Sequence, residues 1–512
     1  MLRYRVRSRR VWGWTIVAPT ALAAVLAVGY LIWSPPSQDL SAATFRADLF
    51  ADHGFVLWNN GWYSGHHVLS YSVLYPPLAA LLGLRVVGAL GVVAAAAVFA
   101  ALARDRFGDQ ALVPALWFAA GAASWLLTGR MAFLLALPLG LGALLAADRG
   151  RAALGALLAA LGSLASPVAG LFVGLAGVAI GLAGERARGA WLAIGAVVPI
   201  VVLNLAFPVG GEEPFVFDAF IAVPVLAVAV LWLVPVEYRA LRIGVLLYAA
   251  LALAVFVIPN ALGGNVTRLG ALLAGPVLAL VLWPRGRLVV VAVSIPLLYW
   301  QLIAPVRDVR EGVGDPASER AYFEPLLAEL DSAPDVGRVH VTPTQNRWEA
   351  AYVAPDFPLA RGWLRQLESD DFDLFTDGSL TPESYRDWLA EHEVGYVAVP
   401  NVDLDYLAED EVALIDTGLE YLDLVWRNDD WRLYRVDGGV PVRAAAVGPD
   451  WFEVDARQPG EHPVGIEFTR WWRVVEGDAC VEEGEDGETV VEARAPGRIR
   501  VEARLSGGSC SE

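Results

Sequence analysis

Residues 86–103 read VVGALGVVAAAAVFAALA, and Arg104 and Arg106 follow directly. An apolar run of this length approaches the roughly 20 residues that a helix needs to cross about 30 Å of hydrocarbon. Ten further runs of the same kind lie at 11–33, 110–128, 131–147, 152–165, 167–184, 190–207, 216–235, 243–258, 266–283 and 288–304. The pattern predicts a polytopic α-helical membrane protein with about eleven spans.

The charge of the chain divides it into two parts that suit different solvents. Of the 512 residues, 56% are hydrophobic and 18% are charged, and all 38 basic side chains are Arg. Residues 1–305 carry 19 Arg against 11 acidic residues, whereas residues 306–512 carry 19 against 45. We therefore expect a transmembrane domain over 1–305 and water-exposed domains after it. The acidity of the second part excludes nucleic-acid binding, which needs a clustered basic face.

The water-exposed part is expected to hold two domains. Over 306–437, helical stretches at 318–330 and 382–391 alternate with short strands at 338–342, 396–399 and 431–436, which indicates an α/β domain. Over 438–512, alternating stretches at 466–475, 489–495 and 498–505 predict a small β-sandwich.

The distribution of Arg between the apolar runs predicts the orientation in the membrane. Breaks with at least two Arg alternate with breaks that carry one or none, and the Arg-rich breaks are Arg3 to Arg10, Arg104/Arg106, Arg149/Arg151, Arg186/Arg188, Arg239/Arg242 and Arg285/Arg287. Because cytoplasmic loops retain positive charge, we expect a multi-pass protein of the plasma membrane with a cytoplasmic N-terminus and an extracytoplasmic C-terminal region.

The two cysteines fit an exported domain. Cys480 and Cys510 both lie in the part expected outside the cell, where a single pair of cysteines usually forms a disulfide. The alternative is two free thiols in a cytoplasmic domain.

The first outer loop concentrates the ionisable residues. If residues 39–53 form one helix, Asp39, Arg46 and His53 fall within one sector of about 60° together with Phe50, because each residue turns the helix by about 100°. Asp39 suits either of two roles: an N-cap that accepts backbone N–H groups, or a catalytic base.

Two adjacent histidines follow in the same loop. His66 and His67 make no credible metal site, because neighbouring side chains diverge and no third ligand has a suitable spacing. A hydrogen bond to a substrate is the functional alternative. The aromatic residues around them suit either sugar stacking or an interfacial belt.

The order of residues in this loop resembles a known family. Asp39, the stretch 46–55 (RADLFADHGF), Trp62-Tyr63, Gly65-His66 and Tyr75-Pro76-Pro77 look like the first outer loop of oligosaccharyltransferase catalytic subunits, which belong to the GT-C superfamily of polytopic glycosyltransferases. Arabinofuranosyl- and mannosyltransferases of that superfamily also carry an extracytoplasmic C-terminal domain. The resemblance implies a lipid-linked sugar donor on the outer face, and a role for Asp39 as base or metal ligand.

The chain departs from the oligosaccharyltransferase pattern in the second outer loop. Where those enzymes have a further acidic pair, this chain has Leu127-Thr128-Gly129-Arg130 and no carboxylate. A monophosphate donor held by Arg suits this sequence better than a metal-bound diphosphate. Arg130 and Arg268 are the candidates for the phosphate, unless they only reach lipid headgroups. No cofactor is expected, and a divalent cation is left open.

A carboxylate pair, Glu212 and Glu213, lies in another outer loop. It suits a second acid or base, or solvated surface charge.

These observations predict a glycosyltransferase that moves sugar from a polyprenyl-phosphate donor to an envelope glycan or glycolipid acceptor. Asp39 is the expected catalytic residue, and the expected substrate-binding residues are Arg46, His53, His66, His67, Arg130, Arg268 and Glu212. Two alternatives stay open: a transporter or flippase, and a non-catalytic protein that binds or assembles envelope polysaccharide.

Overall fold

The computed structural model describes residues 13–283, 286–368, 373–375, 377–438, 443–485 and 487–506. The chain divides into two compact units. Unit 1 holds Met1–Ala43 and Ser70–Val313, and unit 2 holds Thr44–Leu69 and Gly314–Glu512. Most of the stretch 39–77 therefore belongs to the same unit as the C-terminal region.

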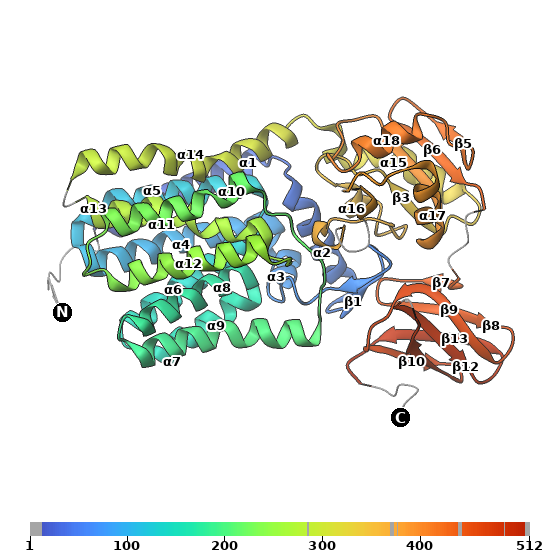
Figure 1. Cartoon of the computed structure of the whole chain (residues 1–512), viewed down its shortest axis with the longest axis horizontal. Coiled ribbons are helices and arrows are strands. Elements are labelled where there is room, and N and C mark those ends of the chain that lie inside the picture. Colours follow the sequence, from blue (N-terminus) through green and yellow to red (C-terminus); the bar gives the residue numbers. More distant parts are fainter. Residues whose placement is uncertain are drawn as a thin grey trace. The chain divides into compact units, whose positions relative to one another are not determined.

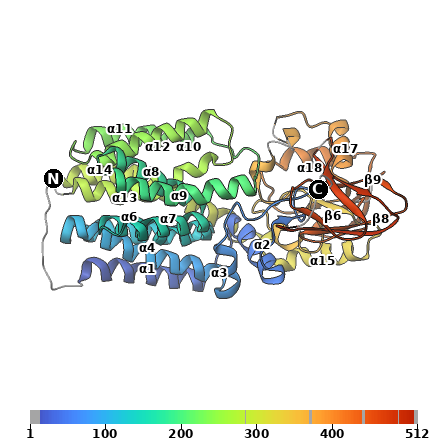
Figure 2. The same ribbon diagram turned by 90° about the horizontal axis from the view of Figure 1, so that it is seen from below.

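Unit 1 is a bundle of helices that run side by side along one direction (Figures 1 and 2). Its helices are α1 (Trp14–Trp33), the start of α2 (Gln38–His53), α3 (Tyr75–Leu82), α4 (Leu84–Phe107), α5 (Leu112–Ser124), α6 (Met131–Asp148), α7 (Ala152–Ala165), α8 (Pro167–Leu182), α9 (Arg186–Ala206), α10 (Phe217–Phe220), α11 (Ala222–Leu233), α12 (Arg239–Val257), α13 (Arg268–Leu282) and α14 (Arg287–Gly312). Short 3₁₀ turns η1 (Gly108–Ala111), η2 (Trp125–Thr128) and η3 (Gly263–Thr267) connect some of them.

Each apolar run predicted from the sequence contains a helix, which confirms those predictions. Seven helical segments in the described residues are long and apolar enough to cross a membrane, and three apolar helices are shorter, at Ala152–Ala165, Pro167–Leu182 and Phe217–Leu233. The chain is therefore described as a multi-pass membrane protein. The count of about eleven spans stays a prediction, and Arg3 to Arg10 and Arg285, used for the orientation, lie outside the described residues.

Small residues let the helices of unit 1 approach closely. A Cβ at Gly189 of α9 would lie 2.4 Å from the backbone oxygen of Gly177 in α8, so only glycine fits there. The helix α14 continues to Gly312, beyond the predicted apolar run that ends at 304. This extension brings polar residues of α14 into unit 1.

The α/β part of unit 2 is built on a four-stranded sheet. Its strands are β3 (Arg338–Val341), β4 (Val394–Pro400), β5 (Leu422–Arg427) and β6 (Trp431–Val436), in the order β3-β4-β6-β5. Only β3 and β4 run parallel. The main helices of this part are α15 (Arg320–Ser332), α16 (Glu349–Tyr352), α17 (Pro382–Glu391) and α18 (Glu409–Ile415).

The second part of unit 2 consists of two antiparallel sheets. They have the strand orders β10-β13-β8-β7 and β11-β12-β9. The strands are β7 (Ala446–Val447), β8 (Trp451–Ala456), β9 (Gly460–Glu467), β10 (Trp472–Glu476), β11 (Ala479–Glu483), β12 (Glu488–Ala493) and β13 (Gly497–Ala503). The single strand predicted over 466–475 is wrong, because the chain turns between β9 and β10 and the two strands pair in different sheets.

Candidate functional site

The predicted catalytic residue Asp39 forms an ion pair in unit 1. Asp39 lies in the first turn of α2, and its Oδ2 accepts a hydrogen bond from Arg130 Nε at 2.7 Å. Both side chains are mostly buried, with 13% and 19% of their surface exposed. The structure therefore joins two residues that the sequence placed about 90 positions apart.

A close backbone approach explains why Arg130 reaches Asp39. Gly129 follows the 3₁₀ turn η2 with φ of +76°, which favours glycine. A Cβ at Gly129 would lie 2.4 Å from Ser37 Oγ and 2.7 Å from the backbone N of Leu40. The turn before Arg130 thus lies directly against the start of α2, and the next residue faces Asp39.

A third charged residue of this cluster, Asp308, was not predicted. It lies on the buried face of α14 and is 6% exposed. It accepts hydrogen bonds from Arg307 Nε at 3.2 Å and from an Arg307 terminal nitrogen at 3.1 Å. Its charge also interacts with those of Arg130 and Asp39. Arg130 is thus influenced by two carboxylates from different helices.

The predicted phosphate ligand Arg268 begins α13 in the same unit. Its guanidinium donates to Asn265 Oδ1 and lies 5.6 Å from the centre of the Phe133 ring. Its buried Nε has no hydrogen-bond partner, and among the described residues no carboxylate pairs with it, in contrast to Arg130. The positive charges of Arg130 and Arg268 repel each other, which indicates that the two guanidinium groups lie near each other.

The carboxylate pair Glu212 and Glu213 lies in the loop between α9 and α10. Glu213 is the member whose charge interacts with Arg268, and its backbone N donates to Asn260 O at 3.0 Å. Glu212 is half-buried in the same loop. Tyr71, which the sequence had marked only as one of several aromatic residues, interacts electrostatically with both Arg130 and Arg268.

Ion pairs at the other end of α6 provide a contrast. Asp148, the last residue of α6, pairs with Arg106 at 2.5 Å, and Arg106 is 54% exposed. Exposed pairs of this kind are typically worth less than about 1 kcal/mol. Arg130 is less exposed than Arg106, at 19% against 54%, whereas the pair of Asp148 with Arg188 is as buried as that of Asp39 with Arg130.

The other predicted ligands of the first loop belong to unit 2. Arg46, in the later part of α2, is buried with its guanidinium 5.8 Å from the Trp62 ring centre and 6.0 Å from that of Trp363. His53, at the end of α2, is exposed, and its charge acts on Asp450. The predicted helix is confirmed. Arg46 on it is buried, whereas His53 on it is exposed.

His66 and His67 form the strand β2, which pairs with β1 (Trp58–Asn59). His67 Nε2 is 3.0 Å from Thr469 Oγ1, next to the β-sandwich strands. His66 stacks on Trp62, and burial lowers its pKa to about 3, aided by the nearby charge of Arg46. Both histidines pack inside unit 2, and their contact with a substrate stays a prediction.

Backbone hydrogen bonds connect the hairpin of β1 and β2 to other parts of unit 2. Leu359 N donates to Gly61 O at 2.9 Å, and Leu359 also bridges to Val339 of β3. On the other side, Asn60 N donates to Pro449 O at 2.7 Å. The loop is therefore hydrogen-bonded to the α/β part and to the residues just before β8.

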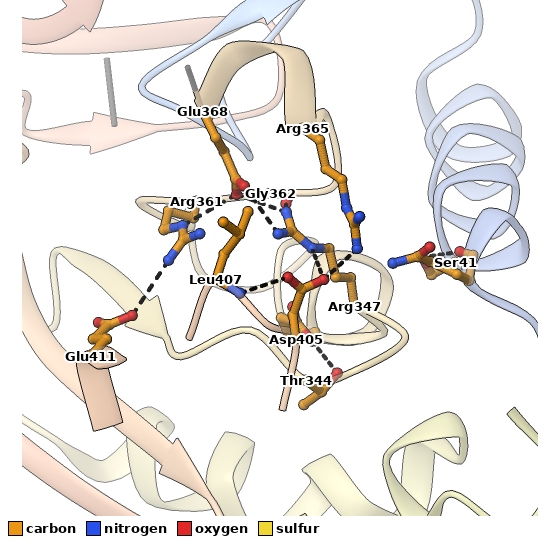
Figure 3. A network of polar contacts seen from close by, with 12 residues as sticks. Ser41, Thr344, Arg347, Arg361, Gly362, Arg365, Glu368, Asp405, Leu407 and Glu411 are labelled. Carbon is orange, nitrogen blue, oxygen red and sulfur yellow. Dashed lines mark hydrogen bonds and ion pairs between the residues drawn. The ribbon is translucent and has the colours of Figure 1, made fainter. Parts of the chain in front are cut away.

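A network of buried charges follows the ends of β3 and β4 in unit 2 (Figure 3). Arg347 is fully buried and donates to both carboxylate oxygens of Glu368, at 2.7 and 3.0 Å, and to Asp405 at 3.2 Å. Arg361 bridges Glu368 and Glu411 at 3.2 and 3.4 Å. Burial disfavours ionised Glu368, but Arg347 and Arg361 outweigh it and hold its pKa below the usual range. No sequence pattern predicts these pairings, because the paired residues lie 7 to 58 positions apart in the chain.

Two further predictions concern metals and the disulfide. Among the described residues, no group of three or more His, Cys, Asp or Glu side chains is placed to hold a metal ion. Metal dependence stays open. Cys480 is buried in β11, and Cys510 lies outside the described residues, so their pairing stays a prediction.

Nine chains of solved structures match this chain, among them an arabinofuranosyltransferase and ArnT. No protein-family model and no curated protein matches the chain. The arabinofuranosyltransferase AftD from Mycobacteria is 16% identical with a TM-score of 0.44, and the match covers 88% of this chain but only 41% of AftD. ArnT from Cupriavidus metallidurans is 15% identical with a TM-score of 0.41, over 82% of this chain and 97% of ArnT.

Proposed function

We propose that the chain is a membrane glycosyltransferase that moves a sugar from a polyprenyl-phosphate donor to a hydroxyl group of an envelope glycan or glycolipid. The observation that carries the proposal is the cluster of Asp39, Arg130 and Arg268, in which Arg130 forms an ion pair with Asp39 and Arg268 forms none with any described residue. Charges are costly beside hydrocarbon and usually serve a function. An anionic lipid headgroup is the ligand that such a place would meet.

In the proposed reaction, Asp39 takes the proton of the acceptor hydroxyl. The acceptor oxygen then forms a bond to the anomeric carbon of the sugar, and the bond from that carbon to the phosphate oxygen breaks. Its electron pair stays on the phosphate, which gains a second negative charge. A positioned carboxylate typically contributes about 10²- to 10⁴-fold to such a transfer.

Arg268 is the proposed ligand of the leaving phosphate. Arg130 forms an ion pair with Asp39, whereas the described hydrogen bond of Arg268 goes to the neutral amide of Asn265, and Asp39 and Glu213 act on Arg268 only at a distance. A cation that meets the growing charge of the leaving group stabilises the transition state more than the ground state. A planar guanidinium also suits two phosphate oxygens at once.

The orientation and the acceptor side belong to the same proposal. The Arg-rich breaks predict that the cluster opens toward the cell exterior, where an undecaprenyl-type donor and an envelope acceptor would meet it. External protease treatment of intact cells should cleave within 314–512. Cleavage only after cell lysis would place this region in the cytoplasm and would contradict the proposal.

The test is transfer of radiolabelled sugar by the purified full chain in lipid nanodiscs, over a panel of polyprenyl-phosphate sugars. Asp39→Asn should lower the rate by about 10²-fold or more, while the matched variant Asp218→Asn keeps it. Asp218 is a suitable control because it also lies in the first turn of a helix but is exposed. Full activity of Asp39→Asn would refute the assignment of the base.

A second pair of variants tests the phosphate ligand. Arg268→Ala should raise the KM for the donor, and Arg268→Lys should recover part of the loss, because Lys keeps the charge but not the planar fork. Arg310→Ala is the control, since Arg310 is exposed on α14. An unchanged donor KM in Arg268→Ala would exclude a role in phosphate binding.

A further inference from the structure

We propose that Asp308 is a positioning residue for the transfer reaction, which acts through Arg130 on the catalytic carboxylate Asp39. The inference rests on the proposed function and adds a residue from the last membrane helix, beyond the predicted apolar run. Asp308 does not need to touch the sugar or the phosphate. Its proposed role is to hold the Arg130 guanidinium between the carboxylates of Asp39 and Asp308.

The buried face of α14 places Asp308 in the cluster. Gln301, Pro305, Asp308 and Gly312 are buried, and their spacing of four, three and four residues lies along one side of a helix. The intervening Arg307 is mostly exposed. Asp308 is therefore held inward by the register of the helix rather than by chance orientation of a surface side chain.

Contacts on both sides of Asp308 fix this face. Gln301 Oε1 accepts from Trp117 Nε1 at 2.8 Å, and the Gln301 carbonyl accepts from Trp125 Nε1 at 3.1 Å. At the other side, a Cβ on Gly312 would lie 2.7 Å from the Pro36 carbonyl oxygen. Trp125 opens the turn that leads to Arg130, and Pro36 lies just before α2. The helix α14 thus contacts the segments that carry both Arg130 and Asp39.

The way in which Arg130 is held leaves a role for a second carboxylate. Asp39 accepts from Nε of Arg130, and in the described part of the chain the terminal nitrogens of Arg130 have no hydrogen-bond acceptor. One hydrogen bond leaves a guanidinium free to turn, and the charge of Asp308 acts on the same guanidinium. A second carboxylate restrains the cation and shares its charge.

The position of Arg130 matters for the chemistry of Asp39. A base must lie within hydrogen-bond reach of the proton that it abstracts, and the hydrogen bond from Arg130 holds the Asp39 carboxylate in place. By attracting the same guanidinium, Asp308 limits how far Arg130 turns and so fixes the position of that carboxylate. The charged and titratable groups that face this arrangement are Asp39 on α2, Arg130 before α6, Arg307 on α14, Arg268 on α13, Tyr71 and Glu213.

A double-mutant cycle in the purified full chain tests the inference. Asp308→Asn should lower kcat by about tenfold or more with an unchanged donor KM, and Asp308→Glu should restore most of it. In an Arg130→Gln background, Asp308→Asn should cause no further loss, because its route of action is already removed. Glu311→Gln, one turn further along α14, is the control and should keep full activity.

Several results would overturn the inference. Additive losses in the double mutant would mean that Asp308 acts independently of Arg130, and an unchanged kcat in Asp308→Asn would remove its role. Asp308→Ser is tested in parallel, and variants count only if their thermal unfolding midpoint matches that of Glu311→Gln. If Asp39→Asn is inactive while Asp308→Asn is normal, the inference fails and the proposed function stands; full activity of Asp39→Asn would remove both.

Discussion

Replacement of Gly129 by Ala should displace Arg130 from Asp39 and impair transfer. The new Cβ would meet Ser37 Oγ at 2.4 Å and the Leu40 backbone N at 2.7 Å, distances that real Cβ atoms essentially never show. Since a backbone atom cannot move aside as a side-chain tip can, the turn η2 must shift away from the start of α2. The shift would stretch the 2.7 Å bond between Arg130 and Asp39.

The loss of stability in Gly129→Ala has two parts. An L side chain at a φ of +76° costs about 1–2 kcal/mol, and forcing a methyl group into a filled space costs about 1–3 kcal/mol more. If the turn relieves the second part by moving about 1 Å, the activity should fall by roughly 10²-fold, because misplacement on that scale disrupts a reacting geometry. Stability and rate should therefore both change.

A matched substitution at Gly150 distinguishes the cost of backbone strain from the cost of the steric clash. Gly150 follows the other end of α6 with a φ of +79°, and a Cβ there would meet nothing within 4 Å. Gly150→Ala should lose only the backbone part, about 1–2 kcal/mol, and keep full transfer. Thermal unfolding and radiolabelled transfer are measured for both variants in nanodiscs. Equal stability loss with full activity in Gly129→Ala would refute the idea that this close approach positions Arg130.

Three further predictions use other parts of the chain. Gln301→Leu should lower stability by about 1–3 kcal/mol through lost hydrogen bonds, including that to Trp117, as measured by thermal unfolding. Burial raises the pKa of Glu349 to about 7 although Thr344 donates a hydrogen bond to it. Its neutral form is favoured in the fold, so stability should fall by roughly 3 kcal/mol as the pH rises from about 4.5 to about 7, and Glu349→Gln should flatten that part of the pH profile; an unchanged profile would contradict the raised pKa. If Arg268 alone holds the donor phosphate, EDTA should leave transfer unchanged, whereas loss of activity that Mg²⁺ or Mn²⁺ restores would indicate a metal.

The helices of unit 1 were predictable because a chain that crosses hydrocarbon can adopt few backbone conformations. A backbone in lipid must satisfy its own hydrogen bonds, so each long apolar run becomes a helix, and 86–103 lies within α4 as expected. The extension of α14 was missed because Arg307, Asp308 and Glu311 read as a polar linker. The pairing of Arg307 with Glu311 at 3.8 Å, one helical turn apart, is the signal that supports a longer helix.

The candidate site was predictable in part for a similar reason. Asp39, Arg130 and Arg268 stand out as charges at the ends of apolar runs, and the structure brings their fields together. His66 and His67 stand out by type alone, whereas their environment depends on partners such as Thr469, hundreds of residues away. A local sequence pattern contains no information about such distant contacts, so packing and ligand binding could not be separated.

The helix α2 is divided between the two units. Asp39 at its start belongs to the unit with Arg130, whereas Arg46 near its middle belongs to the unit with Trp363. The helix is continuous from Gln38 to His53, so Asp39 and Arg46 lie on one element although they belong to different units. Removal of residues 306–512 would leave Arg46 and Trp62 without their packing partners Trp363 and Ala350. The packing of the later turns of α2 therefore depends on residues far along the chain, which no local pattern within residues 39–53 could reveal.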